Sequence, residues 1–489
     1  MQSFQSIDAT TCAQWIKQGK LTPVEAVKIA IDQVKKYNER FHAVVHLYEE
    51  DAIKQAKSLS NLEAPFAGVP ILLKDAGHDY AGHPSTSSSQ LFKNQIATKN
   101  SHYVDQIIKA GFIIIGHTNA PEFALKFVSD SALYGTVPNP VNPKYHAGGS
   151  SGGSVAAVQL GMVPIAAASD GGGSIRIPAS FSGLVGFKPT RGAMPTGPGS
   201  YRSWGGAAID FALTKSIQDT ENFLLAMQLP HQDASAFKVP PLIADDVRNY
   251  EDNINDLNIA YTVDPFIDET PSADAVQAVE KTVNYLQNHG FSVTEVHPNI
   301  NGLKDYLPGY YKMNASEQQK MFQQIKKQRG KAIQPDEVEP LSYLLAIYGE
   351  KIPAWEYSEV FDEWDNLANQ MQQLHETYDV LIQPATAKAA PSLSEDLYHL
   401  EMLPPIETWK DLNKETLGDL IIESLKSGTY YSPYAYIYNL TGQPAISLPV
   451  HSTSEGLPIG VMISARQSQD AKILALSKWL EKHRLFEYY

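Results

Sequence analysis

The chain has 489 residues, is 43% hydrophobic and carries a formal net charge of −15. This length provides a large core for one domain or several, and the acidic balance argues against nucleic acid or an anionic membrane as a main partner, because both bind through basic surfaces. The single cysteine, Cys12, excludes an internal disulfide, and the start "MQSFQSIDATT" lacks the basic and apolar segments of a signal peptide, so we expect a cytoplasmic protein that does not span a membrane.

The first predicted helix begins at Thr22, whose side chain can cap it. Pro23 suits the first turn, and Glu25 completes a capping box. Apolar residues then recur at helical spacing, at Val24, Val27, Ile31 and Val34. We expect residues 1–65 to form an N-terminal helical region.

Beyond residue 66, short apolar runs alternate with helical stretches. Buried strands are predicted at 69–74, 112–116 and 163–169, and helices at 101–111 and 154–161. Alternation of this kind is typical of a mostly parallel sheet with helices on both faces. We therefore predict an α/β fold built on a large mixed, mostly parallel twisted sheet.

The middle of the chain, 222–370, is more polar but keeps the strand-like runs "LNIAYTV" and "FSVTEV" around one helix. Further strands and a closing helix are predicted at 378–384, 443–450, 457–464 and 469–482. The acidic segment 391–430 is expected to form irregular surface loops. These patterns predict a single domain, 1–489, with a sheet core from 66–221 and 371–489 and a more variable helical excursion between them.

A Gly/Ser-rich segment stands directly before a helical one in "YHAGGSSGGSVAAVQLG" (145–161). A flexible linker would be longer and more polar, and neither phosphate-loop pattern, GxxxxGK[ST] or GxGxxG, is present. The segment matches GxSxG, the nucleophile elbow of α/β-hydrolases. Ser150 would then be the nucleophile, with an acid and a histidine downstream, for which His451 could serve; His146 is the histidine nearest to the motif. That interpretation stays open at this point.

A second Gly/Ser-rich stretch, "ASDGGGSIRIPASFSGLVGFKPTRG" (168–192), follows an apolar strand, and three glycines precede Ser174. Glycine permits positive φ and close backbone approach, and successive N–H groups in such a turn form an anion-binding nest. A serine at the end of a nest has what acyl transfer needs: a hydroxyl that attacks and amides that bind the oxyanion. A tight structural turn is the alternative.

A serine nucleophile needs a base, and Lys74 has a more distinctive setting than the 14 histidines. It ends the apolar run "VPILL", where burial would lower the pKa of its ammonium from about 10.4. A neutral lysine is a competent general base. Asp75 would oppose that pKa shift, but neighbouring strand residues point to opposite faces. The alternative is a solvated ion pair at the end of a strand.

Several blocks of the sequence closely resemble the amidase signature family. They are "GVPILLKD" (68–75), "TNAPEF" (118–123), "NPVNP" (139–143), "GGSSGGSVAA" (148–157), "SDGGGSIRIPASFSGLVGFKPTRG" (169–192), "YDVLIQP" (378–384), "NLTGQPAISLP" (439–449) and "GLPIGV" (456–461). The resemblance covers most of the chain and is weakest between about 222 and 370. It implies the amidase signature fold.

The catalytic group of that family is a Ser–cis-Ser–Lys triad. The resemblance implies Ser174 as nucleophile, Ser150 as the bridging serine on a cis peptide bond, and Lys74 as base. It implies an oxyanion hole made by the N–H groups of Gly171, Gly172, Gly173 and Ser174. The resemblance also implies four further site residues. Ser151 supports the hydrogen-bond network, Asp170 and Arg176 flank the nest, and the backbone of Ala124 meets the substrate.

The implied reaction is hydrolysis of a carboxamide C–N bond through an acyl-enzyme, with no metal and no cofactor. The substrate would be a small or mid-sized amide, linear or cyclic; the alternative is the glutamine-hydrolysing subunit of a tRNA-dependent amidotransferase. Ser182 and Gly171 stand where many members have other residues, and they favour free-standing amidases, including the group that resembles cyclic nylon-oligomer hydrolases. Tyrosine-rich segments at 306–321 and 430–439 are candidates for the pocket lining. No nucleic-acid or membrane partner is expected, and a homodimer is left open.

Overall fold

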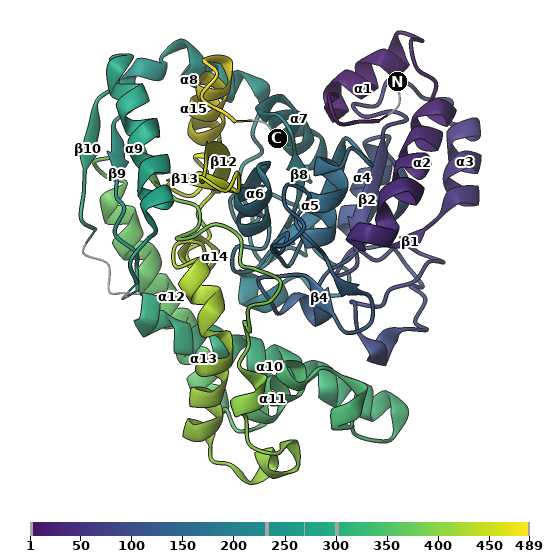
Figure 1. Cartoon of the computed structure of the whole chain (residues 1–489), viewed down its shortest axis with the longest axis vertical. Helices are drawn as coiled ribbons and strands as arrows, with labels where there is room; N and C mark the ends of the chain where they lie inside the picture. The colour runs from purple at the N-terminus through teal and green to yellow at the C-terminus, as the bar shows by residue number, and fades with distance from the viewer. Residues whose placement is uncertain (1–2, 230–233, 268, 299–302, 488–489) are drawn as a thin grey trace.

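The computed structural model describes residues 3–229, 234–267, 269–298 and 303–487, and an 11-stranded sheet runs through its upper part (Figure 1). From one edge to the other, the strands are β1 (Val44–Leu47), β3 (Ile113–Thr118), β2 (Pro70–Lys74), β6 (Ile165–Asp170), β8 (Ile209–Thr214), β7 (Val185–Lys188), β12 (Ala445–Ser452), β13 (Pro458–Ala465), β11 (Val380–Pro384), β9 (Ile259–Tyr261) and β10 (Val293–Glu295). The predicted α/β fold on a large mixed sheet is confirmed.

The direction of the strands differs from the prediction of a mostly parallel sheet. Parallel pairs join β2 to β3 and β6 near one edge, and β9 to β10 and β11 at the other. The middle of the sheet, from β6 through β8, β7, β12 and β13 to β11, is antiparallel throughout. One cause is the short connection between β12 and β13, since only antiparallel neighbours can be joined by a tight turn.

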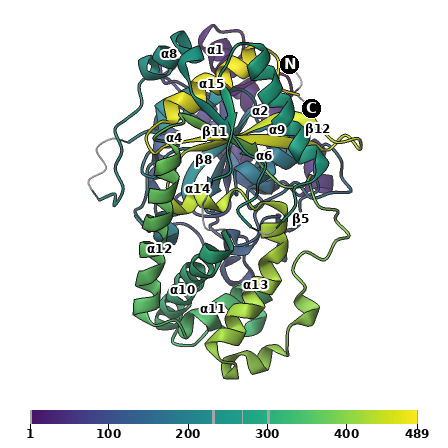
Figure 2. The same cartoon turned by 90° about the vertical axis from the view of Figure 1, so that its left-hand side faces the viewer.

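Helices cover both faces of the sheet. α9 (Ala273–Asn288) and α15 (Asp470–Lys482) pack on one face of β12 and β13, and α6 (Arg176–Ser182) packs on the other (Figure 2). The other helices of this part are α1 (Ala9–Lys17), α2 (Pro23–Phe41), α3 (Glu49–Ser58), α4 (His102–Lys109), α5 (Gly152–Gln159), α7 (Ile217–Met227) and α8 (Ala244–Asp252). The predicted capping box is confirmed at α2, where Thr22 and Glu25 exchange backbone-to-side-chain hydrogen bonds of 2.8 and 3.2 Å.

A second helical group lies below the sheet in Figure 1 and has its own apolar core. It consists of α10 (Leu303–Arg329), α11 (Pro340–Glu350), α12 (Ala354–Leu374), α13 (Lys414–Tyr431) and α14 (Tyr436–Leu440). The expectation of irregular loops over 391–430 was wrong from Lys414 onward, because α13 occupies that part. Its apolar residues Leu417, Ile421 and Leu425 recur at helical spacing and are buried.

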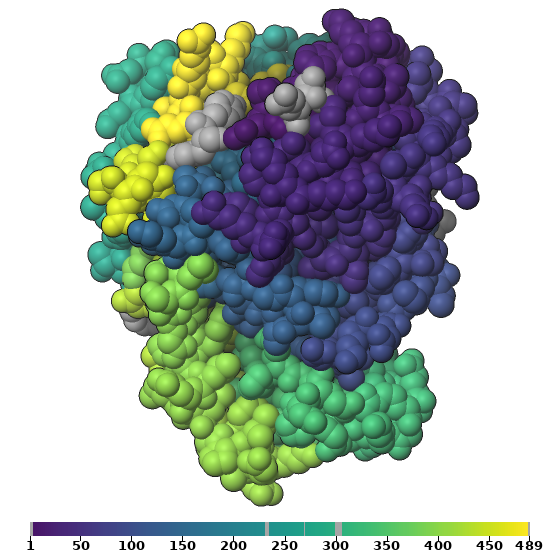
Figure 3. Space-filling view, turned by 45° about the vertical axis from the view of Figure 1, so that its right-hand side comes forward, coloured from purple at the N-terminus to yellow at the C-terminus, as the bar shows by residue number. Residues whose placement is uncertain are grey.

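The space-filling view shows the N-terminal helices, in purple, as a continuous surface over the upper part, with the green helical group below (Figure 3). The sheet itself takes strands from outside the ranges expected for it, since β1 lies within 1–65 and β9 and β10 lie within 222–370. Among the helices of the described ranges, none combines the length and the apolar character needed to cross a membrane.

Candidate active site

Lys74 is the last residue of β2, a strand that is buried along its whole length. Its apolar neighbours Ile71, Leu72 and Leu73 are inaccessible to solvent, and so is its own side chain. The Nζ atom lies 2.7 Å from Ser150 Oγ and 2.8 Å from the Oγ of a second serine, Ser169 on β6. Lys74 and Ser150, which were predicted from distant blocks of the sequence, are therefore in hydrogen-bonding contact.

The environment of Lys74 favours its neutral form. Burial lowers the pKa of Lys74 to about 7, although the carboxylates of Asp210 and Asp170 oppose the shift. Asp75 is engaged elsewhere, since its carboxylate accepts hydrogen bonds from Thr86 Oγ1 at 2.5 Å and from the Ser88 N–H at 2.8 Å. At a pH just above 7, the Lys74 amine can therefore accept a proton.

The backbone at Ser150 follows an unusual path. The Gly149–Ser150 peptide bond is cis, and α5 begins shortly afterwards at Gly152. Ser129 fixes this turn, because its Oγ donates to Ser150 O at 3.1 Å and accepts from the Gly152 N–H at 3.0 Å. A side chain at Gly149 would collide with the Val128 backbone, and one at Gly152 with Ser129 Oγ. This glycine-rich segment is thus a tightly packed turn, and the linker interpretation is wrong.

The second glycine-rich segment connects Asp170 at the end of β6 to Arg176 at the start of α6. These two side chains are fully buried and form a two-point ion pair, with both N–O distances at 2.9 Å. Burial disfavours the Asp170 carboxylate, but the Arg176 guanidinium outweighs it and holds the pKa of that carboxyl well below its usual range. The carboxylate also accepts the N–H groups of Gly173 at 2.8 Å and Ile175 at 3.2 Å, which fixes the loop.

The Gly173 contact changes the predicted oxyanion hole. Its N–H donates to Asp170 Oδ1, so this amide is committed to the carboxylate. The φ angle of Gly173 is +124°, a conformation that L side chains rarely adopt. The N–H groups of Gly171, Gly172 and Ser174 stay as candidates for an oxyanion.

Ser174 follows the nest and is partly exposed, in a pocket that Gly172 also lines. Among the hydrogen bonds of the described residues, none joins the Ser174 hydroxyl to Ser150. The structure therefore brings Lys74 and Ser150 together but leaves the link from Ser150 to Ser174 unmade. Contacts of this kind often tighten only when substrate binds.

Two residues of this site were not predicted from the sequence. Ser169 contacts Lys74 as described, and its backbone carbonyl also accepts from Ser151 Oγ at 3.3 Å, so Ser151 supports the same cluster. Asn439 on α14 donates to Asp170 Oδ1 at 2.8 Å and accepts from Arg176 at 2.7 Å. Ser169 could have been found from its place beside Asp170 on a predicted strand. Asn439 is the first residue of the quoted block 439–449, but its contact with Asp170 joins distant segments, which the local pattern does not specify.

The histidines named for an α/β-hydrolase lie in other surroundings. His451 Nε2 is 3.1 Å from the Asp274 carboxylate on α9. His146 is buried, and burial, helped by the charge of Lys126, lowers its pKa to about 4. The side-chain partner of Ser150 is Lys74, so the contacts do not support a Ser–His elbow at this position.

The pocket at Ser174 lies where the sheet meets the lower helices. Ala124 lines it with a positive φ of 60°, at the position predicted to meet the substrate. Both predicted tyrosine-rich segments contribute to the lining, 306–321 through α10 and 430–439 through α14. Among the described residues, the tyrosines that line the pocket are Tyr310, Tyr311 and Tyr436.

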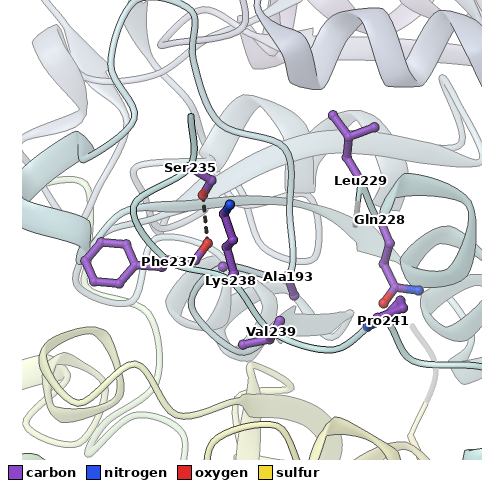
Figure 4. Close-up of a pocket in the computed structure, with 9 residues that line it drawn as sticks. Ala193, Gln228, Leu229, Ser235, Phe237, Lys238, Val239 and Pro241 are labelled. Carbon is purple, nitrogen blue, oxygen red and sulfur yellow. Dashed lines mark hydrogen bonds between the residues drawn. The ribbon is translucent and has the colours of Figure 1, made fainter. Parts of the chain in front are cut away.

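A separate cavity is lined in part by residues of the segment that precedes α8 (Figure 4). Gln228, Phe237 and Pro241 line it, and Ser235 Oγ donates to the Phe237 carbonyl at 2.7 Å. Of the described residues around this cavity, none is a predicted site residue. The pocket at Ser174 is therefore the candidate active site.

Comparison with known proteins gives consistent matches. The family model described as Amidase matches residues 25–474. The chain is 33% identical over 480 residues to a lipoamidase from Enterococcus faecalis, covering 98% of this chain but only 64% of that protein. It is 30% identical over 484 residues to a 6-aminohexanoate-cyclic-dimer hydrolase from Pseudomonas sp. (strain NK87), covering 97% of this chain and 94% of that one.

The fold is also that of solved amide hydrolases. The structure of 6-aminohexanoate cyclic dimer hydrolase complexed with substrate superposes with a TM-score of 0.87 at 27% identity, over 97% of this chain and 96% of that one. A bacterial aryl acylamidase of the amidase signature enzymes shares the fold with a TM-score of 0.83 at 22% identity, over 98% of this chain and 96% of that one. The family match, the relatives and the shared fold agree: the chain belongs to the amidase signature family and is an amidase, a hydrolase of carbon–nitrogen bonds in amides.

Proposed function

We propose that this amidase cleaves its substrate through an acyl-enzyme on Ser174, with Ser150 as proton relay and neutral Lys74 as general base. The observation that carries the proposal is the 2.7 Å contact between Lys74 Nζ and Ser150 Oγ in a fully buried site. Solvent is excluded there, and burial lowers the pKa of Lys74 to about 7. A neutral amine that touches a serine hydroxyl is the arrangement that general-base activation requires.

In the first half-reaction, the Lys74 amine takes the Ser150 proton while Ser150 takes the Ser174 proton. Ser174 Oγ attacks the amide carbonyl and forms a tetrahedral intermediate. When this collapses, the C–N bond breaks and the relay returns its proton to the leaving nitrogen, which departs as an amine or ammonia. In the second half-reaction, water attacks the acyl-enzyme by the same relay, releasing the carboxylic acid and restoring Ser174.

The oxyanion of the intermediate would be held by the N–H groups of Gly171, Gly172 and Ser174. Asp170 and Arg176 act on this step indirectly, because Asp170 fixes the loop through the Gly173 N–H and Arg176 keeps that carboxylate ionised. A preorganised loop costs no reorganisation as the charge develops. These two are positioning residues.

We propose a small or mid-sized amide as substrate, linear or cyclic. Support comes from the tyrosines of the pocket and from the relatives, of which one is named for lipoamide and another for a cyclic dimer of 6-aminohexanoate. A panel of lipoamide, this cyclic dimer, primary amides, anilides and glutamine tests the assignment. Hydrolysis of glutamine alone would favour the amidotransferase alternative.

The acyl-enzyme can be tested directly with a fluorophosphonate, which phosphonylates activated serines. We expect the wild-type protein to gain the mass of one phosphonyl group, with peptide mapping placing it on Ser174. The Ser174→Ala variant should stay unlabelled. As a matched control, Ser182→Ala removes a buried hydroxyl that donates to Ala147 O and should be labelled like the wild type. Labelling that persists without Ser174 would contradict the proposal.

The pH dependence of the reaction follows from the base. Since Lys74 must be neutral to accept a proton, kcat/KM should rise with pH and level off above about pH 7, the pKa of Lys74. Below that value, the loss should approach about tenfold per pH unit. The measurement is kcat/KM against pH, with circular dichroism to confirm that the protein stays folded. Full activity well below neutrality would argue against a lysine base.

One charge near the site allows a sharper version of this test. The Asp210 carboxylate, 28% exposed and 3.1 Å from His78 Nε2, raises the pKa of Lys74 against the effect of burial. Asp210→Asn should therefore move the acid limb of the profile to lower pH. Asp245→Asn, at an exposed ion pair on α8, is the control and should leave the profile in place.

A further inference from the structure

The pocket at Ser174 lies on one side of the proposed nucleophile. Gly172 and Ser174 line it, whereas Lys74 and Ser150 are not among the described residues that do so. In the proposed reaction, the leaving nitrogen takes its proton from Ser150 and must lie toward that residue. The arm of the substrate that fills the pocket is therefore the acyl arm.

The walls of this acyl pocket are mostly apolar. They include Phe127, Ile177, Trp204, Leu345 and Leu425. An acyl chain that fills such a pocket gains binding energy in proportion to the apolar surface removed from water. The pocket therefore favours an aliphatic or aromatic acyl group.

The one charged side chain among the described lining residues is Lys126, and its charge is already matched. Its Nζ lies 2.7 Å from both the Asp130 and the Glu339 carboxylates, so the cluster carries a net negative charge. Burial would lower the pKa of Lys126, but the two carboxylates outweigh it and raise that pKa. A substrate carboxylate would find no unmatched positive charge here and would be repelled.

Two uncharged lining residues of α10, Asn314 and Tyr311, each hold a buried polar atom with no hydrogen-bonding partner among the described residues. Asn314 is 5% exposed, and its unpaired atom is Oδ1, which can only accept a hydrogen bond. A buried acceptor without a partner costs free energy, which a donor on a ligand can recover.

Tyr310 lies beside Asn314 on the pocket wall, and its hydroxyl donates to Gly171 O at 3.2 Å. Burial raises the pKa of Tyr310 well above its usual value, and the Asn314 side chain partly offsets that rise. Asn314 Oδ1 is left as a buried acceptor in the wall of the pocket.

We propose that the acyl pocket selects an uncharged, mainly apolar acyl arm that carries one hydrogen-bond donor, such as an amide N–H, and that Asn314 Oδ1 accepts it. This inference rests on the proposed function of Ser174. It makes Asn314 a specificity-determining residue, and it identifies the substrate as an amide whose acyl chain holds a second N–H or O–H group.

The test uses matched p-nitroanilides of increasing chain length. One series carries an ω-acetamido group, a second has the ω-acetoxy group that replaces the N–H by oxygen, a third is plain alkanoyl, and a fourth ends in a carboxylate. At the best chain length, the wild type should prefer the acetamido over the acetoxy compound by about 10-fold or more in kcat/KM. The carboxylate series should be the slowest.

The Asn314→Leu variant should lose the preference for the acetamido over the acetoxy compound, and a thermal melt checks that it is folded. Gln323→Leu changes an exposed residue of the same helix and should keep the preference. Equal wild-type rates on acetamido and acetoxy compounds at every length would overturn the inference, as would a preference that survives in Asn314→Leu. Both results leave the proposed function intact. If no anilide is cleaved in a Ser174-dependent manner, the proposed function fails and this inference fails with it.

Discussion

Replacing Lys74 by methionine is expected to lower kcat/KM by about 10⁴-fold, because it removes the base that starts the proton relay. Methionine has a similar length and preserves the packing of the buried strand, but it has no nitrogen to reach Ser150. Lys74→Arg should be equally inactive, since a guanidinium keeps its proton at any pH at which the protein is folded. The measurement is kcat/KM on one chromogenic anilide, with a thermal melt for each variant.

Lys188 provides a matched control for this experiment. It is also fully buried, and burial together with the Arg176 charge lowers its pKa to about 7 as well. Its Nζ donates to Pro189 O at 3.0 Å and not to a serine. A pH profile alone cannot distinguish the two lysines, but Lys188→Met should retain most of the activity. Near wild-type rates in Lys74→Met would remove the base from the proposed mechanism.

Features of the fold that depend on a few neighbouring residues were predictable from the sequence. They include the capping box at Thr22 and the buried strands β2, β3, β12 and β13, because a helix cap and an apolar repeat each span only a few residues. The antiparallel centre of the sheet was not, since it depends on β7 lying beside β12, a pairing between segments far apart in the sequence. α13 was missed because its acidic exposed residues obscured a helical apolar pattern and a cap at Asn413.

The site residues likewise fall into those that the local sequence identifies and those that depend on tertiary contacts. Lys74, Ser150 and Ser174 stand out because their glycine-rich or apolar surroundings are unusual over short stretches. The direction of the Gly173 N–H depends on a φ angle and on the position of the Asp170 carboxylate, which sequence does not specify. Asn439 joins the site only because α14 packs against the nest, so tertiary packing determines its role.

The Arg176→Met variant is expected to lose about 3–5 kcal/mol in its free energy of unfolding, the usual cost of breaking a buried ion pair on one side. Arg176 makes two 2.9 Å contacts with Asp170 and others with Asn439 and the Ala435 carbonyl, all away from solvent. Without it, Asp170 would be an unpaired charge in a dry site, and burial would then raise its pKa. The measurement is urea unfolding, with Arg248→Met at an exposed ion pair as a control that should match the wild type.

The pH dependence gives this prediction a definite sign. In the wild type, the pKa of Asp170 is depressed, so its contribution to stability is present above the unfolded-state pKa of about 3.9 and is lost as pH falls below it. In Arg176→Met, the pKa of Asp170 is raised, so the sign is the opposite: protonation of Asp170 as pH falls removes the unpaired charge and stabilises the folded variant. The loss of stability relative to the wild type should therefore shrink as pH falls toward about 3.9, the pKa of the carboxyl in the unfolded chain.

The double variant Asp170→Asn, Arg176→Met removes both charges and should be more stable than Arg176→Met alone at neutral pH. A double variant that is less stable would mean that Arg176 acts mainly through Asn439 and the Ala435 carbonyl, and not through the charge of Asp170.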